Sequence, residues 1–213
     1  MNFHYHANDL IFKVRPNTTD ISIIKEVVVR DTYKISDIEF EGNIVIDIGA
    51  HIGSFSVLAS SLGAQVLAYE PTSMNFELLR DNIELNESNV AIRNQGVLAT
   101  SGETTIYIRD KNFGGSSFYH KGNWQEQIQT VTLKDVFDAN EIDHCSFLKL
   151  DCEGAEFDIL NSFPYFDRIK QIALEYEGDI QAQEKIIMIL NQNNFKVTWN
   201  ANEGMGGIYG IQK

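Results

Sequence analysis

Short apolar runs alternate along the chain with segments in which apolar residues recur every three or four positions. The run 44–48 is branched and apolar except for Asp47, as expected of a parallel strand that is buried on both faces. Beyond it, four apolar residues share one helical face: Phe55, Leu58, Ala59 and Leu62. The pattern therefore predicts a strand, a tight turn at Gly49 and Gly53, and a helix that packs back on the sheet.

The same alternation continues to the end of the chain. Further strands are predicted over 65–69, 90–93, 147–150 and 171–174, followed by a terminal antiparallel hairpin over 195–199 and 208–211. Amphipathic helices are predicted after the strands at 44–48, 65–69, 147–150 and 171–174. We expect an α/β fold with a mostly parallel seven-stranded sheet, a C-terminal antiparallel hairpin and helices on both faces.

The N-terminal segment has a mixed pattern. Residues 1–41 include a strand-like stretch at 10–14 and a helix-like stretch at 21–30. We expect this segment to form a cap that packs on the main unit, residues 42–213, within a single globular protein. The apolar side chains of the cap either pack in the core or lean over a ligand site.

A second irregular region lies between predicted β segments at 104–108 and 130–133. It contains four aromatic residues: Phe113, Phe118, Tyr119 and Trp124. Long loops in compact domains tend to be functional. We predict a lid that closes over substrate and offers His120 to it, with burial of the aromatics against the cap as the alternative.

Composition narrows the classes of partner. The chain has 213 residues, with 17 Lys and Arg against 30 Asp and Glu, and a formal net charge of −13. This charge opposes nucleic-acid binding and favours a neutral or cationic substrate. The sequence has neither an 18-residue apolar stretch nor a leader pattern at Met1, so we expect a cytoplasmic protein with no membrane partner. Cys145 and Cys152 are expected to be free thiols.

The glycine turn points to a particular cofactor. Three residues, Ala50 among them, separate Gly49 from Gly53, so the G-x-G-x-x-G pattern of a pyrophosphate site is missing. Asp47 would repel phosphate and attract a cation such as S-adenosylmethionine. Glu70, 21 residues after Gly49, ends the next strand, where an acid binds ribose hydroxyls. We predict these cofactor-binding residues: Asp47, Gly49, Ala50, His51, Gly53, Glu70, Pro71, Gln95, Gly96 and Asp151.

Acidic residues also follow two later strands. Asp151, Glu153 and Glu156 come after the strand at 147–150, and Glu175 comes after the next one. The helix dipole accounts for Glu156 and partly for Glu153, whereas Asp151 is expected at the ligand crevice. Candidate general bases for a hydroxyl are Asp151, Glu153 and Glu175, followed by His51 and His120. A divalent metal held by the carboxylates is a second, less favoured mechanism, and we assign no metal ligand.

Several blocks together resemble the FkbM-type S-adenosylmethionine-dependent methyltransferases, which have the Rossmann-like class I methyltransferase fold. The blocks are Val45–Gly53, Tyr69–Pro71 with the helix 75–79, 82–86, Leu148–Glu156 and Glu175, and the resemblance spans roughly residues 40–177. The block Asp151–Glu156 is the more specific one. His51 stands where asparagine is usual, and Cys152 where an aliphatic residue is more common.

The resemblance implies O-methylation of a hydroxyl on a small molecule, sugar or polyketide-type acceptor, with S-adenosylhomocysteine as a product. Two other functions are weighed against it. An NAD-type oxidoreductase is disfavoured by the missing middle glycine, and a non-catalytic S-adenosylmethionine-binding module by the intact acids. The sequence leaves the acceptor and the oligomeric state open, including a homo-oligomer.

Overall fold

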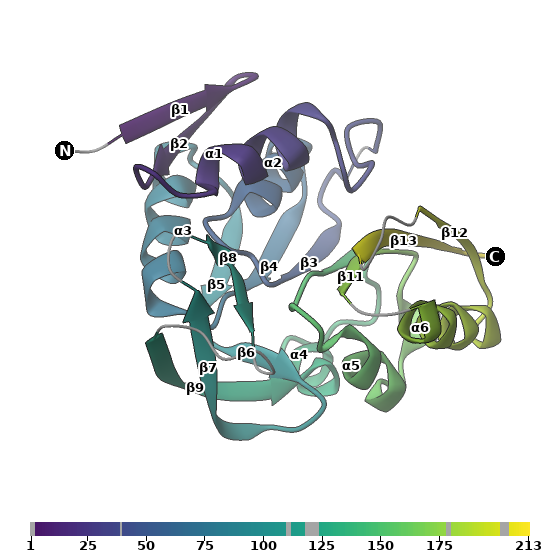
Figure 1. The fold of residues 1–213 in the computed structure, drawn as a ribbon. Coiled ribbons are helices and arrows are strands. Elements are labelled where there is room, and N and C mark those ends of the chain that lie inside the picture. The colour runs from purple at the N-terminus through teal and green to yellow at the C-terminus, as the bar shows by residue number, and fades with distance from the viewer. Residues whose placement is uncertain (1–2, 39, 110–111, 118–123, 178–179, 201–204) are drawn as a thin grey trace.

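A central sheet of seven strands organises the molecule (Figure 1). The computed structural model describes residues 3–38, 40–109, 112–117, 124–177, 180–200 and 205–213. The strand order across the sheet is β12-β13-β11-β10-β3-β4-β5. Their bounds are β3 Ile44–Ile48, β4 Gln65–Tyr69, β5 Val90–Arg93, β10 Phe147–Leu150, β11 Gln171–Glu177, β12 Phe195–Trp199 and β13 Met205–Gln212. β13 pairs antiparallel with both neighbours, which confirms the mostly parallel sheet and its terminal hairpin.

Helices cover both faces of this sheet, as predicted. Alternate residues of β3 serve opposite cores: Val45 packs with α2 (Ser54–Ser61) and α3 (Ser73–Leu85), whereas Ile46 packs with the other helices. These are α4 (Leu133–Ala139), α5 (Glu156–Ser162) and α6 (Ile180–Gln192), with a 3₁₀ turn at Phe166–Arg168. Within the described ranges, no helix is both long and apolar enough to cross a membrane.

The N-terminal segment packs on the face that carries α2 and α3. Its elements are β1 (Phe3–Ala7), β2 (Leu10–Val14), α1 (Asp20–Ile24) and a π-helical turn (Lys25–Val29). Asn82 of α3 accepts a hydrogen bond of 2.6 Å from the Lys13 backbone N–H, and Asn86 accepts one of 3.0 Å from that of Ile11. These bonds anchor the edge of the β1–β2 hairpin to α3.

A second sheet follows β5, and the hydrophobic pattern predicts only parts of two of its strands, at 104–108 and 130–133. Its order is β6-β9-β7-β8, with β6 Gly96–Leu98, β7 Gly102–Arg109, β8 Asn112–Ser117 and β9 Trp124–Thr132 (Figure 1). The prediction of a long loop is wrong for β8 and β9, because backbone pairing with β7 satisfies their polar groups without help from side chains. Phe118, Tyr119 and His120 lie outside the described residues.

Candidate active site

A cavity of about 410 Å³ opens at the carboxyl ends of the central strands, where open α/β sheets bind ligands. Most of the predicted site residues line it: Gly49, Ala50, His51, Glu70, Pro71, Gly96, Asp151, Glu153 and Glu175. Asp47, Gly53 and Gln95 do not. The N-terminal segment supplies another wall through residues such as Thr19, Ser22 and Tyr33, so this segment both packs in the core and faces the cavity.

Glycine is required at both ends of the turn that follows β3. Gly49 has a φ of +78°, and a Cβ there would stand 1.9 Å from the backbone oxygen of Asp151. Gly53 has a φ of +90°, and its Cβ would stand 2.6 Å from a methyl carbon of Leu79. Both positions thus need left-handed backbone and the absence of a side chain. The turn is thereby held directly against the end of β10.

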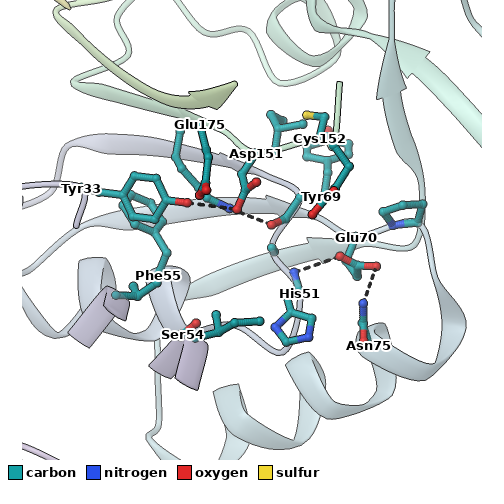
Figure 2. A pocket seen from close by; sticks show the side chains of 18 of the residues that line it. Tyr33, His51, Ser54, Phe55, Tyr69, Glu70, Asn75, Asp151, Cys152 and Glu175 are labelled. Atoms are coloured by element: carbon teal, nitrogen blue, oxygen red, sulfur yellow. Dashed lines mark hydrogen bonds and ion pairs between the residues drawn. The ribbon is translucent and has the colours of Figure 1, made fainter. Parts of the chain in front are cut away.

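Glu70 is held in a fixed orientation by the turn and by α3. Its Oε1 accepts hydrogen bonds from the Thr72 backbone N–H (2.9 Å), the Thr72 hydroxyl (2.6 Å) and the Asn75 amide (3.2 Å). Its Oε2 accepts one bond, of 2.9 Å, from the backbone N–H of His51 (Figure 2). Burial raises the pKa of Glu70, and the bonds from Thr72 counteract part of that rise. The less occupied oxygen, Oε2, retains capacity for a ligand hydroxyl.

A buried lysine, which the sequence analysis did not single out, lies beneath the turn. Lys149 and Asp47 are cross-strand partners on β10 and β3, and Lys149 Nζ lies 3.1 Å from Asp47 Oδ1. It also donates to the Gly49 carbonyl at 2.7 Å and lies 3.6 Å from Asp151 Oδ2. Burial alone would lower the pKa of Lys149, but the charges of Asp47 and Asp151 outweigh it and raise that pKa. The ammonium therefore stays charged.

Asp47 is wholly buried and, together with Lys149, supports the turn from beneath. Its Oδ2 accepts a hydrogen bond of 2.6 Å from the Ser56 hydroxyl. The structure brings its carboxylate to Lys149 and Ser56 rather than into the cavity lining. The sequence signal for this arrangement was a lysine in the middle of an otherwise apolar strand.

Asp151 is oriented by a residue of the N-terminal segment. The Tyr33 hydroxyl donates a hydrogen bond of 3.0 Å to Asp151 Oδ2, the oxygen that also faces Lys149. Burial, with the charges of Asp151 and Glu175, raises the pKa of Tyr33 well above its usual value, so the hydroxyl remains a donor. Figure 2 shows Tyr33, Asp151 and Glu175 converging on one side of the cavity and Glu70, His51 and Asn75 on the other.

Glu156 braces the segment between β10 and α5. Its carboxylate accepts hydrogen bonds from the backbone N–H groups of Cys152 (2.7 Å) and Gly154 (3.1 Å). Burial raises the pKa of Glu156 to about 7. Burial also raises the pKa of the Cys152 thiol well above its usual value, so this cavity-lining cysteine is a poor nucleophile. Among the residues that the structure describes, no group of three His, Cys, Asp or Glu side chains is arranged to hold a metal ion.

The sequence is similar to those of known methyltransferases. The family model described as "Methyltransferase FkbM domain" matches residues 47–197. The hexuronic acid methyltransferase AglP of Haloferax volcanii is 25% identical over 122 residues, which are 56% of this chain and 49% of that protein. The chain thus spans about half the length of this relative. Methyltransferase 1 of Beauveria bassiana is 25% identical over 194 residues, 78% of each chain.

Solved structures share the fold at lower identity. A precorrin-6y C5,15-methyltransferase from Geobacter metallireducens superposes with a TM-score of 0.56 at 14% identity, over 87% of this chain and 88% of that one. A magnesium protoporphyrin IX methyltransferase from Synechocystis, solved with bound S-adenosylhomocysteine, gives a TM-score of 0.55 at 12% identity, over 91% and 84% of the two chains. The class I fold is therefore shared with these proteins.

Proposed function

The chain belongs to the FkbM methyltransferase family, and from that premise we propose that it transfers a methyl group from S-adenosylmethionine to a hydroxyl of a small-molecule acceptor. The observation that carries the proposal is that one cavity is lined both by the Gly49 turn with Glu70 and by the carboxylates of Asp151, Glu153 and Glu175. We also propose that residues 1–41 act as a cap on the unit 42–213, since Tyr33 lines the same cavity.

The cavity fits this cofactor. At Gly49 a Cβ would collide with the backbone of Asp151, so glycine is what holds the turn against the end of β10, beside the cavity. Oε2 of Glu70, with a single protein donor, suits a ribose hydroxyl. The proposed contacts of Ala50, His51, Pro71 and Gly96 follow from their positions in the lining. We propose that Asp47 and Gly53 act indirectly, by supporting the turn, and we retain Gln95 as a neighbour of Gly96.

Asp151 is the proposed general base. The cofactor, when bound, supplies an electrophilic methyl group on a sulfonium centre. Tyr33 and Lys149 hold Oδ2 of Asp151 through donors, while 31% of the side chain remains exposed. The other oxygen, Oδ1, is thus available to accept the proton of an acceptor hydroxyl, a role typically worth ~10²–10⁴-fold in rate. Glu153 and Glu175 line the cavity nearby and are proposed to orient the acceptor.

The charge of the lining favours neutral or cationic acceptors. Acidic side chains in the lining include Glu26, Asp151, Glu153 and Glu175, and the Lys149 ammonium already faces two carboxylates. A carboxylate-bearing acceptor would therefore be repelled. One relative is named a hexuronic acid methyltransferase, so sugars belong in any acceptor panel. We propose that neutral sugars and amino sugars outperform uronic acids here.

Transfer of a labelled methyl group from S-adenosylmethionine to a panel of hydroxyl compounds tests the proposal. We expect labelled ether products, with turnover unaffected by EDTA and reduced about 10²-fold or more by Asp151→Asn, while cofactor affinity changes little. Asp158→Asn, on the following helix, is the matched control. Wild-type turnover by Asp151→Asn would rule out Asp151 as the base, loss of turnover on chelation would require a metal, and labelled product only on nitrogen or carbon would refute O-methylation.

A further inference from the structure

Arg15 lies between β2 and α1, behind the part of the cavity that Glu70 lines. Resting on the proposed function, we propose that Arg15 is a positioning residue for the cofactor, because it orients two of the groups that hold the carboxylate of Glu70. Arg15 itself is not part of the cavity lining, so it acts on the cofactor only through its neighbours. The N-terminal segment thereby takes part in binding the ribose hydroxyls as well as in covering the cavity.

The docking of β2 on α3 brings Arg15 to the site. The backbone N–H groups of Ile11 and Lys13 donate to asparagine side chains of α3. Arg15, two residues further along the chain, donates a hydrogen bond of 2.9 Å from Nη1 to Oδ1 of Asn75, in the first turn of the same helix. Asn75 lines the cavity, so this bond joins the N-terminal segment to the cavity wall.

Asp20 fixes the guanidinium group of Arg15. Its Oδ1 accepts a hydrogen bond of 2.7 Å from Nη2, and its Oδ2 accepts one of 3.0 Å from Nε. Burial alone would raise the pKa of Asp20, but the hydrogen bonds and the charge of Arg15 outweigh burial and lower that pKa, so the pair is ionised. Two-point pairs of this kind are strong and directional. The other N–H groups of the guanidinium therefore point in fixed directions.

Arg15 determines how the amide of Asn75 is turned. A guanidinium group has donors only, so the Asn75 atom that faces it must be the carbonyl oxygen. The amide nitrogen is then turned towards Glu70 and donates to Oε1 at 3.2 Å (Figure 2). Removal of the guanidinium allows the amide to turn over and to present its oxygen to the carboxylate, which would be repulsive.

Arg15 also supports the residue that binds the other oxygen of Glu70. Its Nη2 donates to Nε2 of His51 at 3.1 Å, and burial lowers the pKa of His51 to about 3, so the ring is neutral and can accept this bond. His51 has a φ of +52°, a left-handed conformation that is unfavourable for a residue with a Cβ. Anchoring the ring stabilises this backbone, whose N–H group donates to Oε2 of Glu70 at 2.9 Å.

One guanidinium thus braces donors to both oxygens of the carboxylate that is proposed to bind ribose. Oε1 of Glu70 is reached through Asn75 of α3, and Oε2 through His51 of the turn after β3. Because the cofactor and Arg15 act on the same carboxylate, each favours the binding of the other by thermodynamic linkage. Docking of the N-terminal segment and binding of the cofactor are therefore coupled.

A double-mutant cycle on cofactor affinity tests whether Arg15 acts through Glu70. Lysine at this position keeps a charge opposite Asp20 but lacks the planar fork that reaches both neighbours at once. We expect calorimetry to show that Arg15→Lys binds S-adenosylhomocysteine about 5- to 20-fold more weakly, whereas the same substitution in a Glu70→Gln protein changes affinity by less than about twofold. Arg80→Lys, at an exposed arginine of α3, is the matched control and should leave affinity unchanged.

The 2′,3′-dideoxy analogue of S-adenosylhomocysteine lacks the ribose hydroxyls and gives a second comparison. Arg15→Lys should weaken this analogue by less than about twofold. Equal weakening of both ligands, no weakening of S-adenosylhomocysteine, or an undiminished effect in the Glu70→Gln protein would overturn the inference, because Arg15 would then have no role in ribose binding. Failure of the wild type to bind either ligand would instead contradict the proposed function.

Hydrogen exchange of the wild type gives a test that needs no variant. The backbone N–H groups of Lys13 and Arg15 lie outside the cavity lining and donate to Asn82 and Asp20. With both ligands at the same multiple of their dissociation constants, S-adenosylhomocysteine should slow exchange of these two amides about fivefold more than the dideoxy analogue does. Equal slowing by the two ligands would contradict the coupling.

Discussion

Replacing Glu70 with glutamine tests whether its carboxylate binds the cofactor or only braces the turn. Glutamine can keep an oxygen at the Oε1 position, which accepts bonds from Thr72 and Asn75. It then presents an NH₂ group where Oε2 accepts the His51 N–H at 2.9 Å. Two donors would face each other, so the variant loses one charge-assisted bond within the protein and any bond that Oε2 makes to ribose.

The two losses have separate readouts. Each hydrogen bond to a charged group contributes about 1.5–3 kcal/mol, so we expect Glu70→Gln to lose ~1–3 kcal/mol of unfolding free energy and to bind S-adenosylhomocysteine about 10- to 100-fold more weakly. Urea denaturation measures the first quantity and calorimetry the second. Glu77→Gln, at an exposed position of α3, is the control and should change neither. An unchanged dissociation constant in a folded Glu70→Gln variant would refute direct binding.

Three further predictions concern the support of the site. Asp47→Asn should cost about 3 kcal/mol of unfolding free energy, measured by urea denaturation, because it leaves the buried Lys149 charge without its nearest carboxylate. Adding Lys149→Met should recover part of the loss. A loss below ~0.5 kcal/mol in Asp47→Asn would contradict the supporting role of this ion pair. Burial raises the pKa of Glu156 from 4.5 to about 7, so the folded state binds a proton more tightly than the unfolded state does. The free energy of unfolding of the wild type should therefore fall by about 3 kcal/mol as pH rises from 4.5 to about 7. Glu156→Gln should reduce this dependence on pH, and an unaltered dependence would assign it to other groups. Gly49→Ala should cost ~2–5 kcal/mol of unfolding free energy, because the strain of a left-handed backbone adds to a collision with Asp151. Gly42→Ala is the control: its φ is +74° and the space around it is open, so it should lose only the ~1–2 kcal/mol of backbone strain. Equal losses for the two variants in thermal unfolding would rule out the collision.

The hydrophobic pattern was sufficient to predict the central sheet because its strands are buried on both faces. β3 and β10 read as short apolar runs between polar segments, and their order along the chain restricts the topology of an α/β sheet. The pattern predicts only a strand over 130–133 and does not predict α4. A capping box formed by Thr132 and Asp135 was the signal that marked the helix start.

The pattern does not predict β8 and most of β9 for a different reason. Gly114–Ser117 has the composition of a turn, but this stretch lies in β8 and pairs with β7 through the backbone. Pairing partners of this kind are not encoded in the periodicity of one segment.

The residues of the candidate site were likewise predictable only in part. Acids at strand ends, such as Glu70 and Asp151, were predictable because parallel strands end at one edge of the sheet. Tyr33 and Lys149 were not, because their contacts join segments far apart in the sequence. Whether the predicted residues bind the cofactor stays a prediction, which the variants above test.

The sequence separation of these contacts implies an order in which the two halves of the cavity assemble. The carboxylate of Glu70 is bound by residues within 19 positions along the chain, so its pocket can form as soon as β3, α2, β4 and the start of α3 come together. The Lys149–Gly49 and Tyr33–Asp151 bonds close loops of 100 and 118 residues. Closure of such long loops is slow and depends on β10 docking beside β3. During folding, the carboxylate side of the cavity should therefore be the last to become protected from hydrogen exchange.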